Sequence, residues 1–130
     1  MATRRPYDQA CPIARTLDIV GDRWTLLIVR DLFIGKTRFN QFLDSSPGMP
    51  PKVLSVRLKK LLEHGFIERQ VYSEHPLRAE YHLTETGLSF RPVLHALGEW
   101  GFEHLFDGEE KLRDKVRDVV AEKLPEYQRK

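Results

Sequence analysis

The sequence has very little cysteine and no long apolar run. Cys11 is the only cysteine among its 130 residues, which excludes an intrachain disulfide and a cysteine-based zinc site. The longest uncharged apolar stretch is the six residues from Trp24 to Val29, whereas a membrane-spanning helix needs about 20. A secretory signal would require an apolar segment after the arginines near the N-terminus, and none follows them. We therefore expect a cytoplasmic protein with no membrane partner.

Signatures of catalysis and of metal binding are also missing. The sequence contains no phosphate-binding glycine loop, no nucleophile elbow and no paired acid motif. No two of its histidines are four residues apart on a helix, and none lies beside the cysteine; they are His64, His75, His82, His95 and His104. We therefore predict that the protein is not an enzyme and needs neither a metal nor a cofactor.

What the sequence does have is charge, and the charge is unevenly distributed. Apolar residues make up 41% and charged residues 31%, which is ordinary for one folded domain of this length. The formal net charge is +2, but eight Lys and Arg against four Asp and Glu give +4 between Lys36 and Arg78 and leave −2 elsewhere. A basic middle is a possible footprint for a polyanion, although scattered solvated charge would give the same count.

We expect four short helices in the first half of the chain, over residues 12–20, 23–34, 38–44 and 51–64. Pro12 suits the first helical position, where its missing N–H has no partner, and Cys11 then occupies the N-cap. Gly21 ends this helix, and Asp22 is placed to cap the next one through a backbone N–H.

The helix expected over residues 51–64 has two contrasting faces. At 100° per residue, four leucines share an arc of about 100° and form a stripe to be buried: Leu54, Leu58, Leu61 and Leu62. The opposite side is polar and basic apart from one valine: it carries Lys52, Val56 and Lys59, with Ser55 and Lys60 on its flanks.

A β-hairpin and two further helices are expected after that helix. Residues 66–72 and 79–83 are rich in β-formers, and residues 73–78 between them predict a six-residue tip. Thr84 is expected to cap a long helix that reaches about residue 106, which Pro92 should kink or break. A last amphipathic helix is expected over residues 109–124.

This order of elements predicts a fold that is mainly α with a small β-hairpin wing, a winged helix-turn-helix. The major groove of B-DNA is about 12 Å wide and admits one helix, which must bury one side in its domain and show polar and basic groups on the other. We therefore predict double-stranded DNA as the partner, with contacts from the two helices and the wing: Thr37, Arg38, Lys52, Ser55, Val56, Arg57, Lys59, Lys60, His75 and Arg78. The alternative is a winged helix that binds a protein through the same face.

The sequence also resembles a known family, the HxlR-type regulators, a branch of the MarR-like winged-helix proteins. The resemblance covers residues 11–101 and is carried by several motifs together, which include Cys11-Pro12-Ile13, Arg38-Phe39-Asn40-Gln41-Phe42, Leu54-Ser55-Val56-Arg57-Leu58, Gly65-Phe66-Ile67-Glu68-Arg69, Tyr81-His82-Leu83-Thr84-Glu85-Thr86-Gly87 and Glu99-Trp100. It implies a homodimeric bacterial or archaeal transcription regulator. This chain has Pro50-Pro51 where family members often have Ser or Thr, which removes an N-cap oxygen.

The resemblance implies that the dimer forms through the first helix and the helices after the wing. We expect one winged-helix domain over residues 1–130, with a DNA-binding core at 10–84, its wing at 66–83, and dimerisation helices at 84–124. A twofold dimer would also cover apolar residues that a small core cannot, and would read a palindromic operator. The expected interface residues are Ile13, Leu17, Leu94, Leu97, Trp100, Leu105, Leu112 and Val116. The alternative is that the tail folds back onto its own domain.

Cys11 is the single candidate for chemistry. A thiolate at a helix N-cap is stabilised by free N–H groups and by the helix dipole. Relatives use a cysteine at this position as a redox or electrophile sensor, so the resemblance implies an oxidant or small-molecule effector whose identity is open. The alternative is that Cys11 is a small capping or packing residue.

Overall fold

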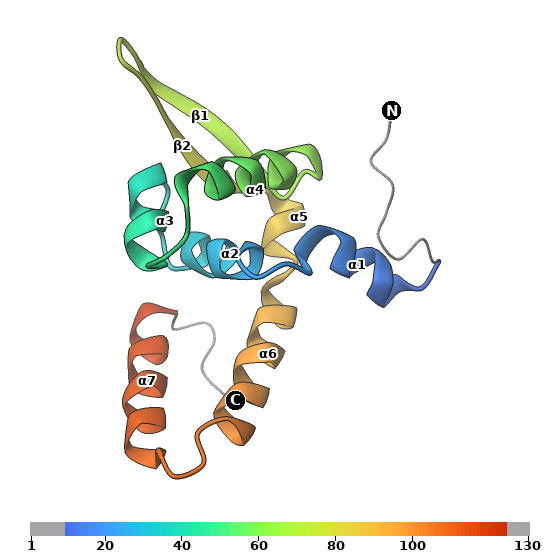
Figure 1. The fold of residues 1–130 in the computed structure, drawn as a ribbon, viewed down its shortest axis with the longest axis vertical. Coiled ribbons are helices and arrows are strands. Elements are labelled where there is room, and N and C mark those ends of the chain that lie inside the picture. The colour runs from blue at the N-terminus through green and yellow to red at the C-terminus, as the bar shows by residue number, and fades with distance from the viewer. Residues whose placement is uncertain (1–9, 125–130) are drawn as a thin grey trace. The chain divides into compact units, whose positions relative to one another are not determined.

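The computed structural model describes residues 10–124 of the chain. The chain divides into two compact units, Met1–Gly87 and Leu88–Lys130. In the first unit the elements follow one another as α1 (Pro12–Val20), α2 (Thr25–Phe33), α3 (Phe39–Ser45), α4 (Pro51–Glu63), β1 (Ile67–Glu74), β2 (Leu77–Leu83) and α5 (Glu85–Leu88), the last of which ends one residue beyond the boundary (Figure 1). The second unit contains α6 (Arg91–His104) and α7 (Glu110–Lys123). The predicted winged helix-turn-helix fold is confirmed, with a single two-stranded antiparallel sheet among the described residues.

The core of the first unit lies between α2, α3 and α4. Helix α3 packs against both α2 and α4, while β1 and β2 contact α4 and α2 respectively. The predicted leucine stripe of α4 supplies Leu54 and Leu61, which are fully buried, and Leu58, which is 2% exposed; Leu62 is only half-buried. Ile28, Val29 and Phe42 complete this core from the other two helices. Periodic apolar positions therefore become the inner faces of a three-helix core.

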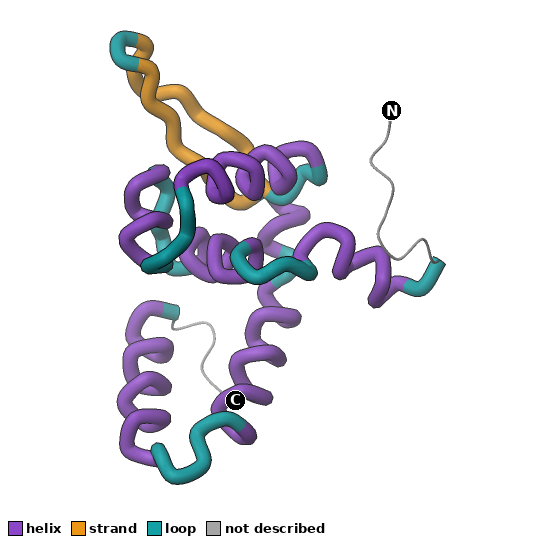
Figure 2. The backbone as a smooth tube through the Cα atoms, viewed as in Figure 1, coloured by secondary structure: helices purple, strands orange, loops and turns teal. Residues whose placement is uncertain are grey.

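Two turns position the helices of the helix-turn-helix: one precedes α2, and the other joins α3 to α4. Asp22 accepts hydrogen bonds from the backbone N–H groups of Trp24 and Thr25, both at 2.9 Å, so the predicted cap at the start of α2 is confirmed. Between α3 and α4, Gly48 has a φ of +94°, a left-handed conformation that favours glycine. The loop that contains this turn joins α3 to α4 (Figure 2), and the two helices contact each other.

The hairpin differs from the prediction at its tip. Strand β1 continues to Glu74 and β2 already begins at Leu77, so the loop has two residues, His75 and Pro76, and the expected six-residue tip is wrong. The register runs from the pair Ile67 and Leu83 to the pair Glu74 and Leu77. Cross-strand hydrogen bonds extend the ladder into polar residues whose composition alone does not favour strand.

The expected long helix after the wing is broken. Thr84 caps α5, because its hydroxyl accepts a hydrogen bond from the backbone N–H of Gly87 at 3.2 Å. Pro92 then lies in the first turn of α6, where a missing N–H costs nothing, so of the two expected outcomes a local break is the one observed. Helix α7 begins and ends one residue inside the predicted range.

Candidate nucleic-acid interface

The outward face of α4 is polar and basic, as predicted. Lys52, Ser55 and Lys59 are exposed, and Val56 among them is 49% exposed. Lys60 on the flank is half-buried. In the described part of the chain, neither Lys52 nor Lys59 takes part in an ion pair. Their charges are therefore free to meet an external anion.

Helix α4 starts without a side-chain cap. Its N-cap is Pro50, which makes no capping hydrogen bond, and Pro51 occupies the first turn. The expectation that Pro50-Pro51 removes an N-cap oxygen is confirmed. Proline at these positions fixes φ at the helix start and so costs little there.

Arg57 is held by the protein itself. Its Nε lies 3.2 Å from Oδ1 of Asp22, and its side chain is 28% exposed. Burial raises the pKa of Asp22, but hydrogen bonds from Thr25 and Trp24 and the charge of Arg57 outweigh that effect and lower the pKa below its ordinary value. Asp22 is therefore ionised at neutral pH and ties the first turn of α2 to α4. A DNA contact by Arg57 stays a prediction.

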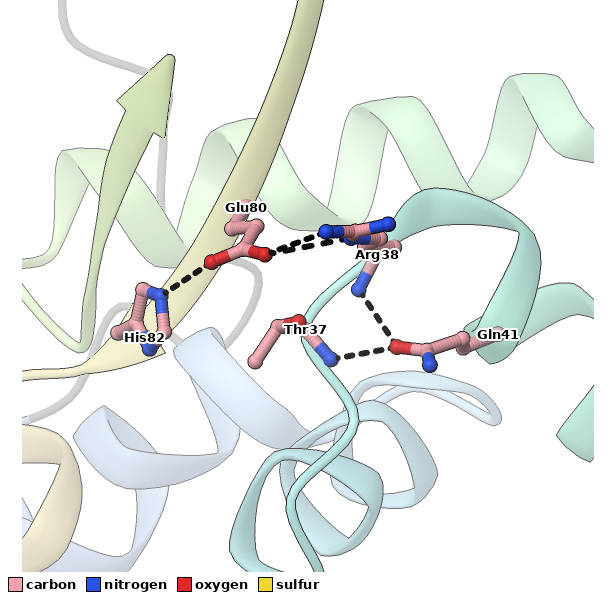
Figure 3. Close-up of polar contacts among 5 residues, drawn as sticks. All are labelled: Thr37, Arg38, Gln41, Glu80 and His82. Carbon is pink, nitrogen blue, oxygen red and sulfur yellow. Dashed lines mark hydrogen bonds and ion pairs between the residues drawn. The ribbon is translucent and has the colours of Figure 1, made fainter. Parts of the chain in front are cut away.

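Arg38 and Thr37 meet at the start of α3, where Figure 3 shows them beside the wing. The side-chain Oε1 of Gln41 accepts hydrogen bonds from the backbone N–H groups of both Thr37 (2.8 Å) and Arg38 (2.9 Å). Both N–H groups already have an acceptor in Gln41. A phosphate contact at this point would therefore come from the side chains.

The Arg38 side chain reaches across to strand β2. Its Nε and Nη2 donate to Oε2 of Glu80 at 3.2 and 3.0 Å, and Oε1 of Glu80 lies 3.2 Å from Nε2 of His82 (Figure 3). The hydrogen bonds from Arg38 and His82 lower the pKa of Glu80. Its carboxylate is thus charged at neutral pH and pairs with Arg38. Glu80 and His82 are two residues apart on one strand, which places them on one face of the hairpin.

The wing tip is exposed and carries a free cation. His75 and Arg78 are both exposed, and the Ser73 hydroxyl donates to the carbonyl of Pro76 at 2.9 Å across the tip. No ion pair within residues 10–124 involves Arg78. The cations of the wing tip and of the outer face of α4 are in this way left available on the same unit.

The other predicted residues lie at the surface. Cys11 is the N-cap of α1 and is exposed, but its side chain makes no capping hydrogen bond. Of the expected interface residues, Leu94 and Val116 are half-buried, and the remaining six are 40–70% exposed: Ile13, Leu17, Leu97, Trp100, Leu105 and Leu112. Their roles in sensing and in dimerisation stay predictions.

Two carboxylates hold predicted DNA-contacting arginines in place, and neither pairing was predicted. Glu80 and Asp22 each bind an arginine from an element distant in sequence. The alternation of Glu80 and His82 along a strand was a usable signal that they share a face. Nothing in the sequence pairs Arg38 with Glu80, since 42 positions separate them.

The described residues offer neither a metal site nor a membrane-spanning helix. Residues 10–124 contain no group of three or more His, Cys, Asp or Glu side chains placed to hold a metal ion. No helix within that range is both long enough and apolar enough to span a bilayer.

Comparisons with known proteins agree with this geometry. A regulator of the helix-turn-helix type from Synechocystis is 43% identical over 95 residues, which are 73% of this chain and 70% of that protein. The helix-turn-helix-type transcriptional regulator YdeP of Bacillus subtilis is 34% identical over 118 residues, which are 91% of this chain and 86% of YdeP.

Solved structures point the same way. The reduced form of the redox regulator HypR superposes with a TM-score of 0.70 at 32% identity, over 77% of this chain and 99% of HypR. The reduced transcriptional regulator YodB of B. subtilis gives a TM-score of 0.62 at 32% identity, over 74% of this chain and 95% of YodB. The family model of HxlR-like helix-turn-helix proteins matches residues 19–109. Because this match covers most of the chain, and the chain has the exposed basic helix and the wing described above, it belongs to the HxlR-like helix-turn-helix family.

Proposed function

We propose that this protein is a sequence-specific DNA-binding transcription regulator that acts as a homodimer. The observation that carries the proposal is the division of α4 into a buried leucine face and an exposed face with Lys52, Ser55, Val56 and Lys59. A helix with that division fits a major groove about 12 Å wide while it stays anchored in its domain. The proposed role includes no catalytic step, and in bacteria it would be performed in the cytoplasm, where the chromosome lies.

The contacts divide into two kinds. Lys and Arg side chains of α4 and of the wing neutralise phosphates, which sets affinity and register on the duplex. Ser55, Val56 and either Lys52 or Lys59 reach base edges, where the exposed Val56 suits a thymine methyl group. Arg78 and His75 at the wing tip contact the flanking backbone or minor groove.

A homodimer would place two such units on one operator. The apolar residues exposed on α1, α6 and α7 provide surface for a second copy, which a twofold axis would cover symmetrically. In such a dimer the two copies of α4 would lie about 34 Å apart, one turn of B-DNA, and the operator would be palindromic.

A salt titration tests the proposal. Purified protein is titrated with duplex DNA from upstream of its own gene and with a random duplex between 50 and 200 mM salt. If each dimer contacts six to ten phosphates, affinity should fall by about 10³- to 10⁵-fold over this range. A flat salt response, or equal affinity for both duplexes, would overturn the proposal.

Two variants separate the kinds of contact. Arg78→Ala should weaken binding to all sequences alike and reduce the salt slope, because it removes a phosphate contact. Val56→Ala should instead change the preferred sequence, which selection of bound DNA from a random pool would reveal. Lys111→Ala removes an exposed cation of α7 and is the matched charge control for Arg78→Ala; it should leave both affinity and the salt slope unchanged.

We propose further that Cys11 makes DNA binding responsive to oxidants. Two facts support this role: Cys11 is exposed, and HypR, a similar structure, is described as a redox regulator. With one thiol per chain, oxidation would form a disulfide between subunits, a mixed disulfide or a sulfenic acid. Diamide should change the affinity of the wild type and leave Cys11→Ser unaffected; an equal change in both would overturn this part of the proposal.

A further inference from the structure

Arg38 is held from two sides by the wing. The Oε2 atom of Glu80 accepts from its Nε and Nη2, so one edge of the guanidinium lies on a carboxylate (Figure 3). The guanidinium carbon also lies 4.4 Å from the ring centroid of Tyr72, so one face rests on an aromatic ring. An arginine with an edge and a face both occupied keeps few of its rotamers.

An irregularity in the hairpin brings Tyr72 to this place. Val71 pairs with Ala79 and Ser73 pairs with Arg78, so Tyr72 is an extra residue on β1 without a partner on β2. A bulge of this kind redirects the side chain that it carries. The backbone N–H of Tyr81 donates to the carbonyl of Thr37 at 2.8 Å, which fixes the same stretch of β2 to the residue before Arg38.

The remaining edge of the guanidinium is open. The Arg38 side chain is 52% exposed, and its Nη1 has no acceptor within residues 10–124. Its backbone is fixed as well, because Gln41 accepts from the N–H groups of Thr37 and Arg38. An arginine fixed in this way presents two N–H donors at the start of α3, in the geometry that binds a phosphate oxygen.

We propose that Glu80, helped by Tyr72, is a positioning residue that holds Arg38 so that its open edge meets a DNA phosphate at the start of α3. This inference rests on the proposed function. Glu80 itself repels phosphate, so it can favour binding only through Arg38. Its contribution is that the guanidinium is already ordered before DNA arrives, which removes an entropic cost of association.

The test compares two variants with the same change of charge. Glu80→Gln removes the carboxylate that orders Arg38. Glu68→Gln removes an exposed carboxylate of β1; because Glu68 pairs with His82 and Gln70 pairs with Glu80, it lies on the same face of the hairpin. Affinity for the operator duplex is measured at several salt concentrations, and the midpoint of thermal unfolding verifies that each variant folds. We expect Glu80→Gln to bind about 2- to 12-fold more weakly than Glu68→Gln per copy, the effect of ordering one long side chain.

The same pair of variants in an Arg38→Ala background shows whether Glu80 works through Arg38. The difference between Glu80→Gln and Glu68→Gln should then disappear, because the group that Glu80 positions is gone. A difference that persists without Arg38 would mean a purely structural role and would overturn the inference. Equal affinities in the presence of Arg38 would overturn it too, while leaving the proposed function intact. A wild type that binds no duplex would overturn both.

Discussion

The two units of this chain differ in where their apolar side chains are placed. In the first unit Ile28, Val29, Phe42, Leu54 and Leu61 are completely buried. In the second unit neither α6 nor α7 contains a buried residue, and the described residues from Leu88 onward include only two, Phe90 and Leu124. The first unit thus has a core of its own, whereas the second consists of amphipathic helices that contain no buried residue.

Polar contacts follow the same division. In the first unit the buried Asp31 accepts a hydrogen bond from the Ser45 hydroxyl at 2.9 Å and pairs with Arg30 at 3.0 Å, which links α2 to the end of α3. In the second unit Arg117 joins the two helices from the surface, with its Nη1 3.4 Å from Glu99 and its guanidinium 4.3 Å from the Phe102 ring. Partly exposed contacts of that kind contribute little stability. The second unit is where we propose that a second copy of the chain packs.

The largest effect is expected from emptying the core of the first unit. Phe42→Ala should lower the free energy of unfolding by about 3–5 kcal/mol, because it removes a fully buried aromatic ring and leaves a cavity. Urea denaturation measures the change. Leu77→Ala, on a side chain that is 60% exposed, should change it by less than about 0.5 kcal/mol. Equal changes in the free energy of unfolding for the two variants would contradict the assignment of Phe42 to the core and Leu77 to the surface.

The next effect concerns the second unit. If its exposed apolar face is an interface, Trp100→Ala should raise the dimer dissociation constant by about 30-fold or more, as expected for an aromatic residue at the centre of an interface. Sedimentation equilibrium measures this constant. Glu103→Ala, an exposed polar position on the same helix, should leave it unchanged. A wild type that stays monomeric at micromolar concentration would refute the dimer.

Alanine substitutions at Gly87 in the first unit and at Gly98 in the second test how tightly each unit is packed. A Cβ on Gly87 would lie 2.2 Å from the carbonyl oxygen of Phe66, so Gly87→Ala should cost about 1–3 kcal/mol of stability as the backbone shifts. A Cβ on Gly98, inside α6, would meet nothing within 4 Å, so Gly98→Ala should stabilise the helix by about 0.5–1 kcal/mol. Thermal unfolding measures both changes: the midpoint should fall for Gly87→Ala and rise for Gly98→Ala. Two changes of the same sign would contradict the difference in packing.

The last effect is a pH dependence that originates in the first unit. The pKa of Asp22 is lower in the folded protein than in the unfolded chain, so its contribution to stability is present above the unfolded value of about 3.9 and is lost as pH falls through the folded value. Asp22→Ala should cost about 0.5–2 kcal/mol at pH 7, the usual range for a helix cap. It should also flatten the fall in stability below pH 4, measured by urea denaturation across pH. An unchanged acid limb would show that Asp22 is not the group responsible.

Much of the first unit could be predicted because its signals are local. The proline at the start of α1, the Asp22 cap and the leucine spacing of α4 each act within a few residues, and the structure confirms them. The hairpin tip could not be predicted in the same way. Cross-strand hydrogen bonds stabilise the pairing of polar residues near the tip. Strands β1 and β2 therefore extend beyond the residues that favour strand by composition.

The candidate interface divides along the same line. Its exposed cations on α4 follow from helical periodicity, which also places the leucines opposite them. The residues that fix Arg38 and Arg57, namely Glu80 and Asp22, depend on contacts between distant segments. No local sequence pattern predicts these carboxylate–arginine pairs, because each carboxylate taken alone resembles any other acidic surface residue.

The sequence by itself determined the order of the elements and the buried and exposed faces of α4, and it indicated that the chain near Pro92 would kink or break. Hydrophobic periodicity, capping and proline geometry operate over one or two turns of chain. Tertiary structure alone decided which charges are free and which are paired, and which amphipathic helices pack into a core. Those outcomes depend on distances between residues far apart in the chain, which exist only after the protein has folded.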